Sequence, residues 1–326
     1  MKALLPAFIK RYSMNWEYLI VPIAVFIALF NALLPAALES VNHGLLSAAS
    51  SGFGHSFVIW FCLLLAICLC RDGSGRSHHS DNLMAFTATS TLFERLLTAL
   101  LIALIMIPSA SLSWIICALL SLLWLKSLTR DSRYRRAALI VFAIAIRDPS
   151  CQFFLTFFAD QILSFDAWLS GLLLLFSNES FQIESNTISQ DNGYSLLILT
   201  GCSAFQNLSL ALLLWLTLSL YRHQEITTND GIRAALLIVA VLAVNGTRLA
   251  LMAINKDWYL FLHDGDGALL IDAFIVLFAL LCVRSTSHEN QIPQFKQAHF
   301  VPARTCLFYR PTEPNRQDQQ RCYSAE

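Results

Sequence analysis

Charged residues are scarce in this chain, and their scarcity limits the class of protein it can be. Only 13% of the residues are Asp, Glu, Lys or Arg, whereas soluble domains carry about 25%. Hydrophobic residues make up 56%. The formal net charge is zero, so no overall positive field points to nucleic acid as a partner. The apolar residues gather in runs close to the roughly 20 residues that cross a bilayer, which predicts an integral membrane protein.

The sequence also lacks the spacing patterns of common cofactor and metal sites. It contains no P-loop, no dinucleotide fingerprint and no internal repeat. Its nine cysteines give no zinc pattern, since Cys62, Cys68 and Cys70 have no second pair at the required spacing. The pair His78–His79 most simply belongs to a solvated loop. We therefore expect no cofactor and no metal.

Eight apolar runs predict an all-α fold, a polytopic membrane bundle with about eight transmembrane helices. Lys and Arg gather before the first run, in alternate connections and in the tail, so both termini are expected to be cytoplasmic. The predicted spans cover residues 17–38, 55–70, 93–109, 112–128, 136–147, 194–221, 232–254 and 267–284.

The segment between the fifth and sixth spans has two possible interpretations. Residues 152–176 are apolar but are interrupted by Asp160 and Asp166, and residues 178–193 are acidic with no Lys or Arg. We expect an amphipathic helix or re-entrant pair lying at the outer face. In the alternative, residues 152–176 span the membrane and every later connection changes sides.

Three chemically reactive side chains fall near one predicted membrane face. Cys202 lies about 12 Å below the outer start of the span 194–221, at 1.5 Å per residue. Arg248 lies about 9 Å from the outer end of the span 232–254, and His263 follows in the outer connection. Ionisable groups inside a span are costly, so they indicate a functional site.

These residue types suit acyl transfer. A thiol attacks a carbonyl as the thiolate, which a nearby cation favours. Histidine can take the thiol proton and return it to a leaving amine. Arginine can hold the developing oxyanion, and Asn245 shares a helix face with Arg248. Taken one at a time, each group also has a structural explanation, such as an arginine that extends to the interface.

Three short motifs carry a resemblance to a known family. The chain reads Gly193-Tyr-Ser-Leu-Leu-Ile-Leu-Thr-Gly-Cys202-Ser203-Ala204, then Asn245-Gly-Thr-Arg248-Leu249, and then His263-x-x-x-Gly267. Over about residues 147–284 this resembles the exosortase/archaeosortase family of multi-pass membrane cysteine transpeptidases, which has Cys-Ser-Gly, Asn-x-x-Arg and a distal His in this order. Ala204 stands where the family usually has glycine.

The resemblance implies a role for each matching residue. Cys202 corresponds to the nucleophile, Arg248 to the family's arginine and His263 to the third catalytic group. Asn245 and Ser203 would orient these groups or bind the substrate.

The resemblance also implies a substrate and a location. The partners would be secreted proteins with a C-terminal sorting signal, in which a short motif such as Pro-Glu-Pro precedes a transmembrane helix and a basic cluster. Cleavage would form a thioester at the outer face of the bacterial cell membrane, among membrane lipid, before transfer to an amine or to water.

The resulting domain assignment has three parts. Residues 1–146 are expected to form an N-terminal transmembrane bundle, and residues 147–284 the exosortase-like catalytic region. Residues 285–326 are rich in proline, glutamine and arginine and predict a polar, mostly disordered cytoplasmic tail.

Other functions and other residues stay open. A transporter or membrane assembly component is the main alternative function, although the polar groups lie near one face, no repeat is visible and no carboxylate lies deep inside a span. A structural scaffold with an inert Cys202 is a third. Cys151 is the rival nucleophile, and His43 or His55 could replace His263.

Overall fold

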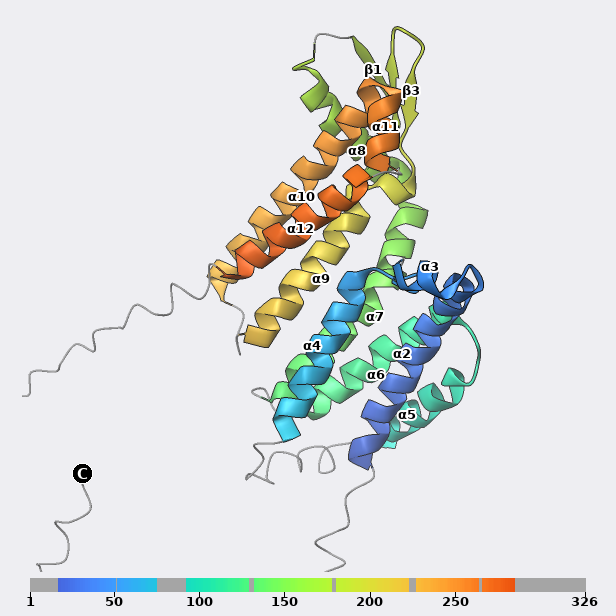
Figure 1. Ribbon diagram of the computed structural model, residues 1–326. Helices are drawn as coiled ribbons and strands as arrows, with labels where there is room; N and C mark the ends of the chain where they lie inside the picture. Colours follow the sequence, from blue (N-terminus) through green and yellow to red (C-terminus); the bar gives the residue numbers. More distant parts are fainter. Residues whose placement is uncertain are drawn as a thin grey trace, which may run out of the picture. The chain divides into compact units, whose positions relative to one another are not determined.

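The computed structural model describes residues 17–50, 52–74, 92–128, 132–177, 180–222, 227–263 and 266–284. The pair His78–His79 and the predicted tail lie outside these residues. The described part is mainly helical (Figure 1). Its helices are α2 (Glu17–Asn42), α3 (Leu45–Ser50), α4 (Phe57–Ser74), α5 (Leu92–Ile105), α6 (Ala110–Ser127), α7 (Arg133–Phe157), α8 (Ala159–Leu174), α9 (Ala204–Arg222), α10 (Thr228–Ile254), α11 (Lys256–His263) and α12 (Asp266–Arg284).

Five of the described helices, α2, α6, α7, α9 and α10, are long and apolar enough to cross a membrane. The pair α11–α12 is bent by 55° and makes a sixth if it forms one broken span. By the length and hydropathy of its helices, the chain is a multi-pass membrane protein. The large exposed side chains of these helices, such as Phe26 and Phe30 on α2, are those that a lipid environment accommodates.

Five of the eight predicted spans correspond to described helices that are long enough to cross a membrane, and the α11–α12 pair would give a sixth. Each predicted run does contain a helix, but α5 has 14 residues and reaches only about 21 Å, against a hydrocarbon core of about 30 Å. The apolar part of α4, Phe57–Arg71, is also short. Eight crossings therefore stay a prediction, which the short helices α4 and α5 do not support by their length.

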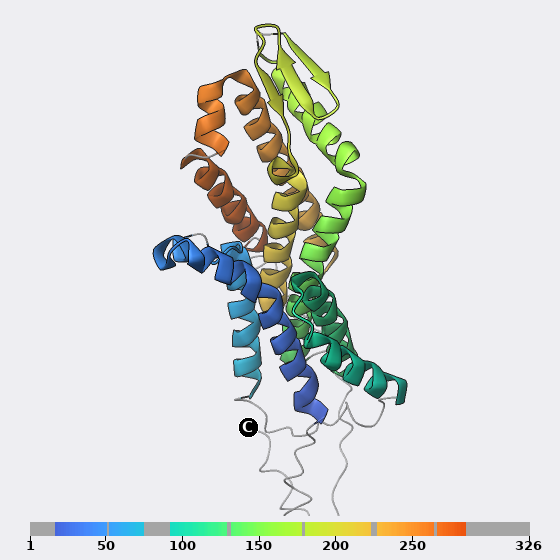
Figure 2. The ribbon, with the colours of Figure 1, turned by 90° about the vertical axis from the view of Figure 1, so that its right-hand side faces the viewer.

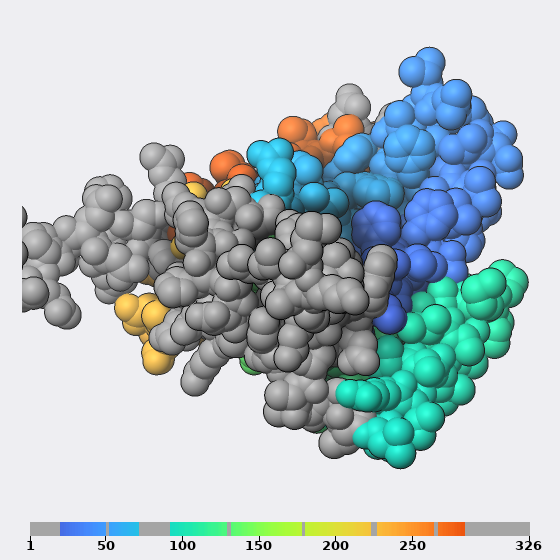
Figure 3. All heavy atoms as spheres, turned by 90° about the horizontal axis from the view of Figure 1, so that it is seen from below, coloured from blue at the N-terminus to red at the C-terminus, as the bar shows by residue number. Residues whose placement is uncertain are grey.

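Small residues allow the first helices to approach one another closely. On α2, Ala24, Ala28 and Ala32 recur every fourth residue and are all buried. This helix packs against α6 and also contacts α5, and the view from below shows α2 beside the α5 segment (Figure 3). Stripes of small residues are a common means of helix packing in membranes, where the hydrophobic effect does not drive association.

The later helices form a second set of contacts. Helix α10 packs against α8, α9, α11 and α12, and it lies among them in both ribbon views (Figure 2). Helix α9 also contacts α7 and α4, which links it to the first helices. Helix α10 begins with a capping box, in which Thr227 and Asp230 each bond the other's backbone N–H.

Helix α7 is longer than predicted. The sequence predicted a short span over 136–147, whereas the helix covers Arg133–Phe157 and is capped by Ser132, whose side chain accepts from Arg135 N. The expected domain boundary after residue 146 therefore falls inside this helix. The division into domains stays a prediction.

A small sheet occupies the segment expected to be only an amphipathic outer-face region. Strands β1 (Phe181–Glu184), β2 (Thr187–Gln190) and β3 (Ser195–Leu197) pair antiparallel in the order β1-β2-β3. The inward side chains Ile188 and Leu196 face each other across β2 and β3 and are buried. The turn before β3 contains Asn192-Gly193, and Gly193 has a φ of 87°, a hairpin signal that the sequence analysis missed.

The predicted span 194–221 starts too early. Its first residues form β3 and then the 3-10 helix η2 (Thr200–Cys202), and α9 begins only at Ala204. An apolar strand and an apolar helix cannot be told apart by composition over so few residues. Cys202 therefore lies just before a helix and not two turns inside one.

Sidedness can be tested by labelling. A cysteine placed at Asp191, in the β2–β3 turn, should react with a membrane-impermeant maleimide added to intact cells. One placed at Asn229, in the first turn of α10, should react only after the cells are opened, because Lys and Arg gather on its side. Both are compared with the parent protein's own labelling. The reverse pattern would place the Cys202 end of the bundle in the cytoplasm.

Candidate active site

Cys202 ends the short 3-10 helix that connects the sheet to α9. Its N–H donates to Leu199 O at 2.9 Å, and Ser203 N donates to Thr200 O at 3.3 Å, which closes the turn. The residue is buried, with 8% of its surface exposed. Because α9 starts two residues later, Cys202 stands at the end of the helix where the helix dipole favours negative charge.

The side chain of Asn245 joins this turn to α10. Asn245 has no exposed surface, and its Nδ2 donates to Cys202 O at 3.2 Å. Its Oδ1 accepts from Asn207 Nδ2, on α9, at 3.3 Å. A buried amide with both ends bonded has only one favourable orientation. The predicted orienting residue is thus in direct contact with the backbone of the predicted nucleophile.

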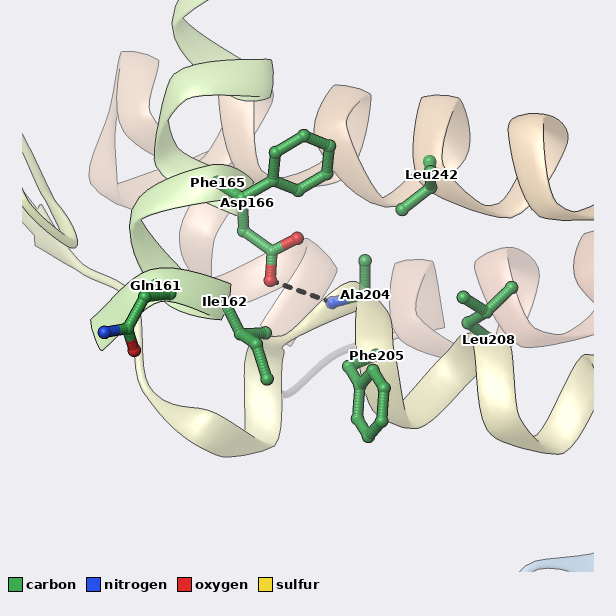
Figure 4. Close-up of a pocket in the computed structure, with 8 residues that line it drawn as sticks. All are labelled: Gln161, Ile162, Phe165, Asp166, Ala204, Phe205, Leu208 and Leu242. Carbon is green, nitrogen blue, oxygen red and sulfur yellow. Dashed lines mark hydrogen bonds between the residues drawn. The ribbon is translucent and has the colours of Figure 1, made fainter. Parts of the chain in front are cut away.

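Asp166 holds the other side of the same turn from α8. Its Oδ2 accepts from Ala204 N at 3.1 Å (Figure 4), and the Ser203 hydroxyl also hydrogen-bonds the carboxylate. Only 2% of Asp166 is exposed. Burial raises the pKa of this carboxyl, and the hydrogen bonds from Ser203 and Ala204 oppose the rise. Ser203, the second predicted orienting residue, is itself fully buried.

A hydrogen bond connects the Arg248 side chain to the backbone of α11 next to His263. Arg248 Nε donates to Leu262 O, the residue before His263, at 3.1 Å. His263 is the last residue of α11, and its ring stacks on Tyr259 with centroids 4.9 Å apart. Arg248 also interacts electrostatically with Asp272 of α12. The hydrogen bond from Arg248 therefore joins the end of α11 to α10.

A buried cluster brings these segments together. It contains Cys202 with Leu249 and Leu262, the neighbours of Arg248 and His263. The hydrogen bonds connect the same segments. Asn245 of α10 bonds the Cys202 turn, and Arg248, one helical turn further along α10, bonds the end of α11. The segments that carry the three predicted catalytic residues lie at one end of the bundle.

The backbone N–H groups of the Cys202 turn are already used. Those of Cys202 and Ser203 donate to carbonyls within the turn. Ala204 N donates to Asp166, and Phe205 N donates to Ser203 Oγ at 3.1 Å. An oxyanion formed at Cys202 would need a donor other than these four groups.

A hollow opens beside this turn, between α8, α9 and α10. Its volume is about 350 Å³, and apart from Asp166 and Gln161 its walls are apolar (Figure 4). The lining residues are Gln161, Ile162, Phe165, Asp166, Ala204, Phe205, Leu208 and Leu242.

The alternative candidates lie in other surroundings. His55 Nε2 donates to Leu33 O at 3.2 Å, and the ring packs edge-on against Trp60. These contacts place His55 at the α2–α4 connection and outside the Cys202 cluster. His43 follows α2 in the same connection. Cys151 is buried on α7, one turn from Arg147, which bonds Ser209 of α9. It stays the rival nucleophile.

Two acidic residues of this site were not assigned by the sequence analysis. In the sequence Asp166 is an interruption of an apolar segment, and Asp272 lies within the predicted span 267–284. Both lie in otherwise apolar helices, and an ionisable residue in such a helix is itself an indication of function. In the described ranges, no group of three or more His, Cys, Asp or Glu side chains could hold a metal ion.

Comparison with known protein families, with curated proteins and with solved structures found no match to this chain.

The role of Asn245 can be tested by truncation. Asn245→Ala leaves the buried Cys202 carbonyl without its donor, which should lower the free energy of unfolding by about 1–3 kcal/mol. The matched control is Asn207→Ala, which removes a bond from the other end of the same amide. Thermal unfolding of the detergent-purified proteins measures both. An Asn245→Ala protein as stable as Asn207→Ala would show that the amide does not hold the turn.

Proposed function

We propose that this protein is a membrane-embedded cysteine peptidase or transpeptidase of the exosortase type, acting on the C-terminal sorting signals of secreted proteins. The observation that carries the proposal is the hydrogen bond from Asn245 to the Cys202 carbonyl. It joins the turn of the proposed nucleophile to the helix that carries Arg248. The bond from Arg248 to Leu262 then connects that helix to the residue before His263.

The reaction needs only groups of this site and the substrate. The Cys202 thiol gives its proton to His263, and the sulfur attacks the carbonyl carbon of the scissile peptide. The carbon–sulfur bond forms, the carbon–nitrogen bond breaks, and His263 returns the proton to the leaving amine. An amine or water then attacks the thioester, and the Cys202 sulfur leaves and regains its proton.

The hydrogen bonds of the turn support an oxyanion role for Arg248. In many acyl-transfer enzymes backbone N–H groups hold the oxyanion, but the four N–H groups from Cys202 to Phe205 already have partners. Arg248 Nε is used on Leu262 O, which orients the guanidinium. Its two terminal nitrogens are the donors we assign to the oxyanion.

The proposed location follows from the distribution of charge. The chain would lie in the bacterial cell membrane with both termini in the cytoplasm and the Cys202 end of the bundle at the outer face. A sorting signal that enters the membrane from outside would then bring its cleavage motif to the depth of Cys202. Membrane lipid would surround both partners.

A transporter is the second candidate. The observation that favours it is the electrostatic interaction between Arg248 and Asp272, because charged residues inside membrane helices often mark transport pathways. Arg248 is six residues from the end of α10, whereas transporter sites lie near the bilayer midplane. A transporter would not depend on Cys202 as a nucleophile.

The nucleophile can be tested by substitution. Cys202→Ala and Cys202→Ser should abolish processing of a secreted reporter that carries the C-terminal signal of a protein from the same genome. Processing is followed by the loss of the signal's mass, and accumulation of the variants in the membrane is the control for folding. Normal processing by Cys202→Ala, with loss in Cys151→Ala, would move the nucleophile to Cys151.

The role of Arg248 can be separated from its charge. Arg248→Lys keeps a cation but loses the planar donors, so processing should fall by about 10²-fold or more, the cost of one oxyanion donor. Alkylation of Cys202 by iodoacetamide, a displacement of iodide that forms no oxyanion, should change little. If the Arg248→Lys variant processed the reporter at the parental rate, Arg248 would not be an oxyanion donor in this reaction.

A further inference from the structure

Asp166 is a buried charged residue that the proposed reaction does not use. It lies on α8, where 2% of its surface is exposed. Its hydrogen-bond partners are the Ser203 hydroxyl and the Ala204 N–H, which belong to the two residues that follow Cys202. Burying a carboxylate is costly unless its bonds compensate for the lost water.

Asp166 supports the start of α9 from another helix, because the Ala204 N–H has no acceptor within α9. Ser203 already acts as a local cap, because its Oγ accepts from Phe205 N at 3.1 Å. Asp166 adds contacts from a different helix, to the Ser203 hydroxyl and to the Ala204 N–H. The Cys202 turn is therefore held from α8 by Asp166 and from α10 by Asn245.

We propose that Asp166 is a positioning residue for Cys202, which acts by fixing Ser203 and Ala204 against α8 so that the thiol is held toward the scissile carbonyl. The inference rests on the proposed function. It assigns a role to a residue outside the three resembling motifs, and it makes α8 part of the active site.

The position of the carboxylate has two opposite effects on Cys202. Its hydrogen bonds orient the turn, which favours the reaction, since a displacement of about 1 Å can cost about 10²-fold in rate. Its negative charge disfavours a nearby thiolate. Removing Asp166 should therefore slow processing while it makes Cys202 more reactive toward a small alkylating reagent at a given pH. A residue that only stabilised the fold would not produce this opposition.

The test compares Asp166→Ala and Asp166→Asn with the control Asp160→Asn, an exposed acid on the same helix. The full-length proteins in membranes are assayed for reporter processing and for the rate of Cys202 alkylation between about pH 6 and 10, which brackets the ordinary thiol pKa of about 8.5. All variants keep the other titratable groups at this end of the bundle: Arg248, His263, Tyr259, Asp272, Tyr194 and Cys151.

Asp166→Ala should lower processing by at least about tenfold, and Asp166→Asn, which keeps an acceptor oxygen, should lower it less. In both, the alkylation profile should move toward lower pH by on the order of one unit. Asp160→Asn should match the parent in both measurements. If the Asp166→Ala variant fails to accumulate, the Asp166→Asn variant alone tests the inference, through the shift of its alkylation profile along the pH axis.

Two results would overturn the inference. One is parental processing by Asp166→Ala, and the other is slower processing with an unmoved alkylation profile, which would indicate a purely structural contact. Failure of the proposed function itself has a different signature: the parent's processing would be unaffected by Cys202→Ala.

Discussion

The side chain of Asn245 connects the elements on which the site depends. It is fully buried between α9 and α10, accepts from Asn207 and donates to the Cys202 carbonyl. An amide without access to water must be bonded at both ends, because an unsatisfied buried polar group is expensive. This requirement fixes the distance between the Cys202 turn and α10, and Arg248 stands one turn further along the same helix.

The remaining contacts build on this connection. Arg248 bonds the backbone of α11, so its guanidinium joins α10 to α11, and its positive charge acts on Asp272 of α12. Asp166 supports the Cys202 turn from α8. These particular polar contacts lie around the Cys202 turn and the ends of α10 and α11, where a membrane protein can bring together reactive groups and an external substrate.

The sequence predicted the helical content and the site residues for different reasons. Apolar runs are long, so all eight predicted spans contain a helix, but short runs such as α5 were counted as crossings. The i,i+3 spacing of Asn245 and Arg248 was enough to predict a shared helix face. The sheet and the start of α9 were missed, because residues 181–203 are short segments whose identity depends on the Ile188 and Leu196 contacts. Asp166 could not be linked to Cys202 from sequence, since 36 residues and a sheet separate them.

In the proposed reaction, Cys202 forms a thioester with the carboxyl end of its substrate. The most direct measurement is mass spectrometry of the full-length protein, isolated under mildly acidic conditions from cells that make the reporter. We expect an adduct on the peptide that contains Cys202. Hydroxylamine should release this adduct, and the Cys202→Ala variant should lack it. An adduct on the peptide containing Cys151, or processed reporter with no adduct on any cysteine, would contradict it.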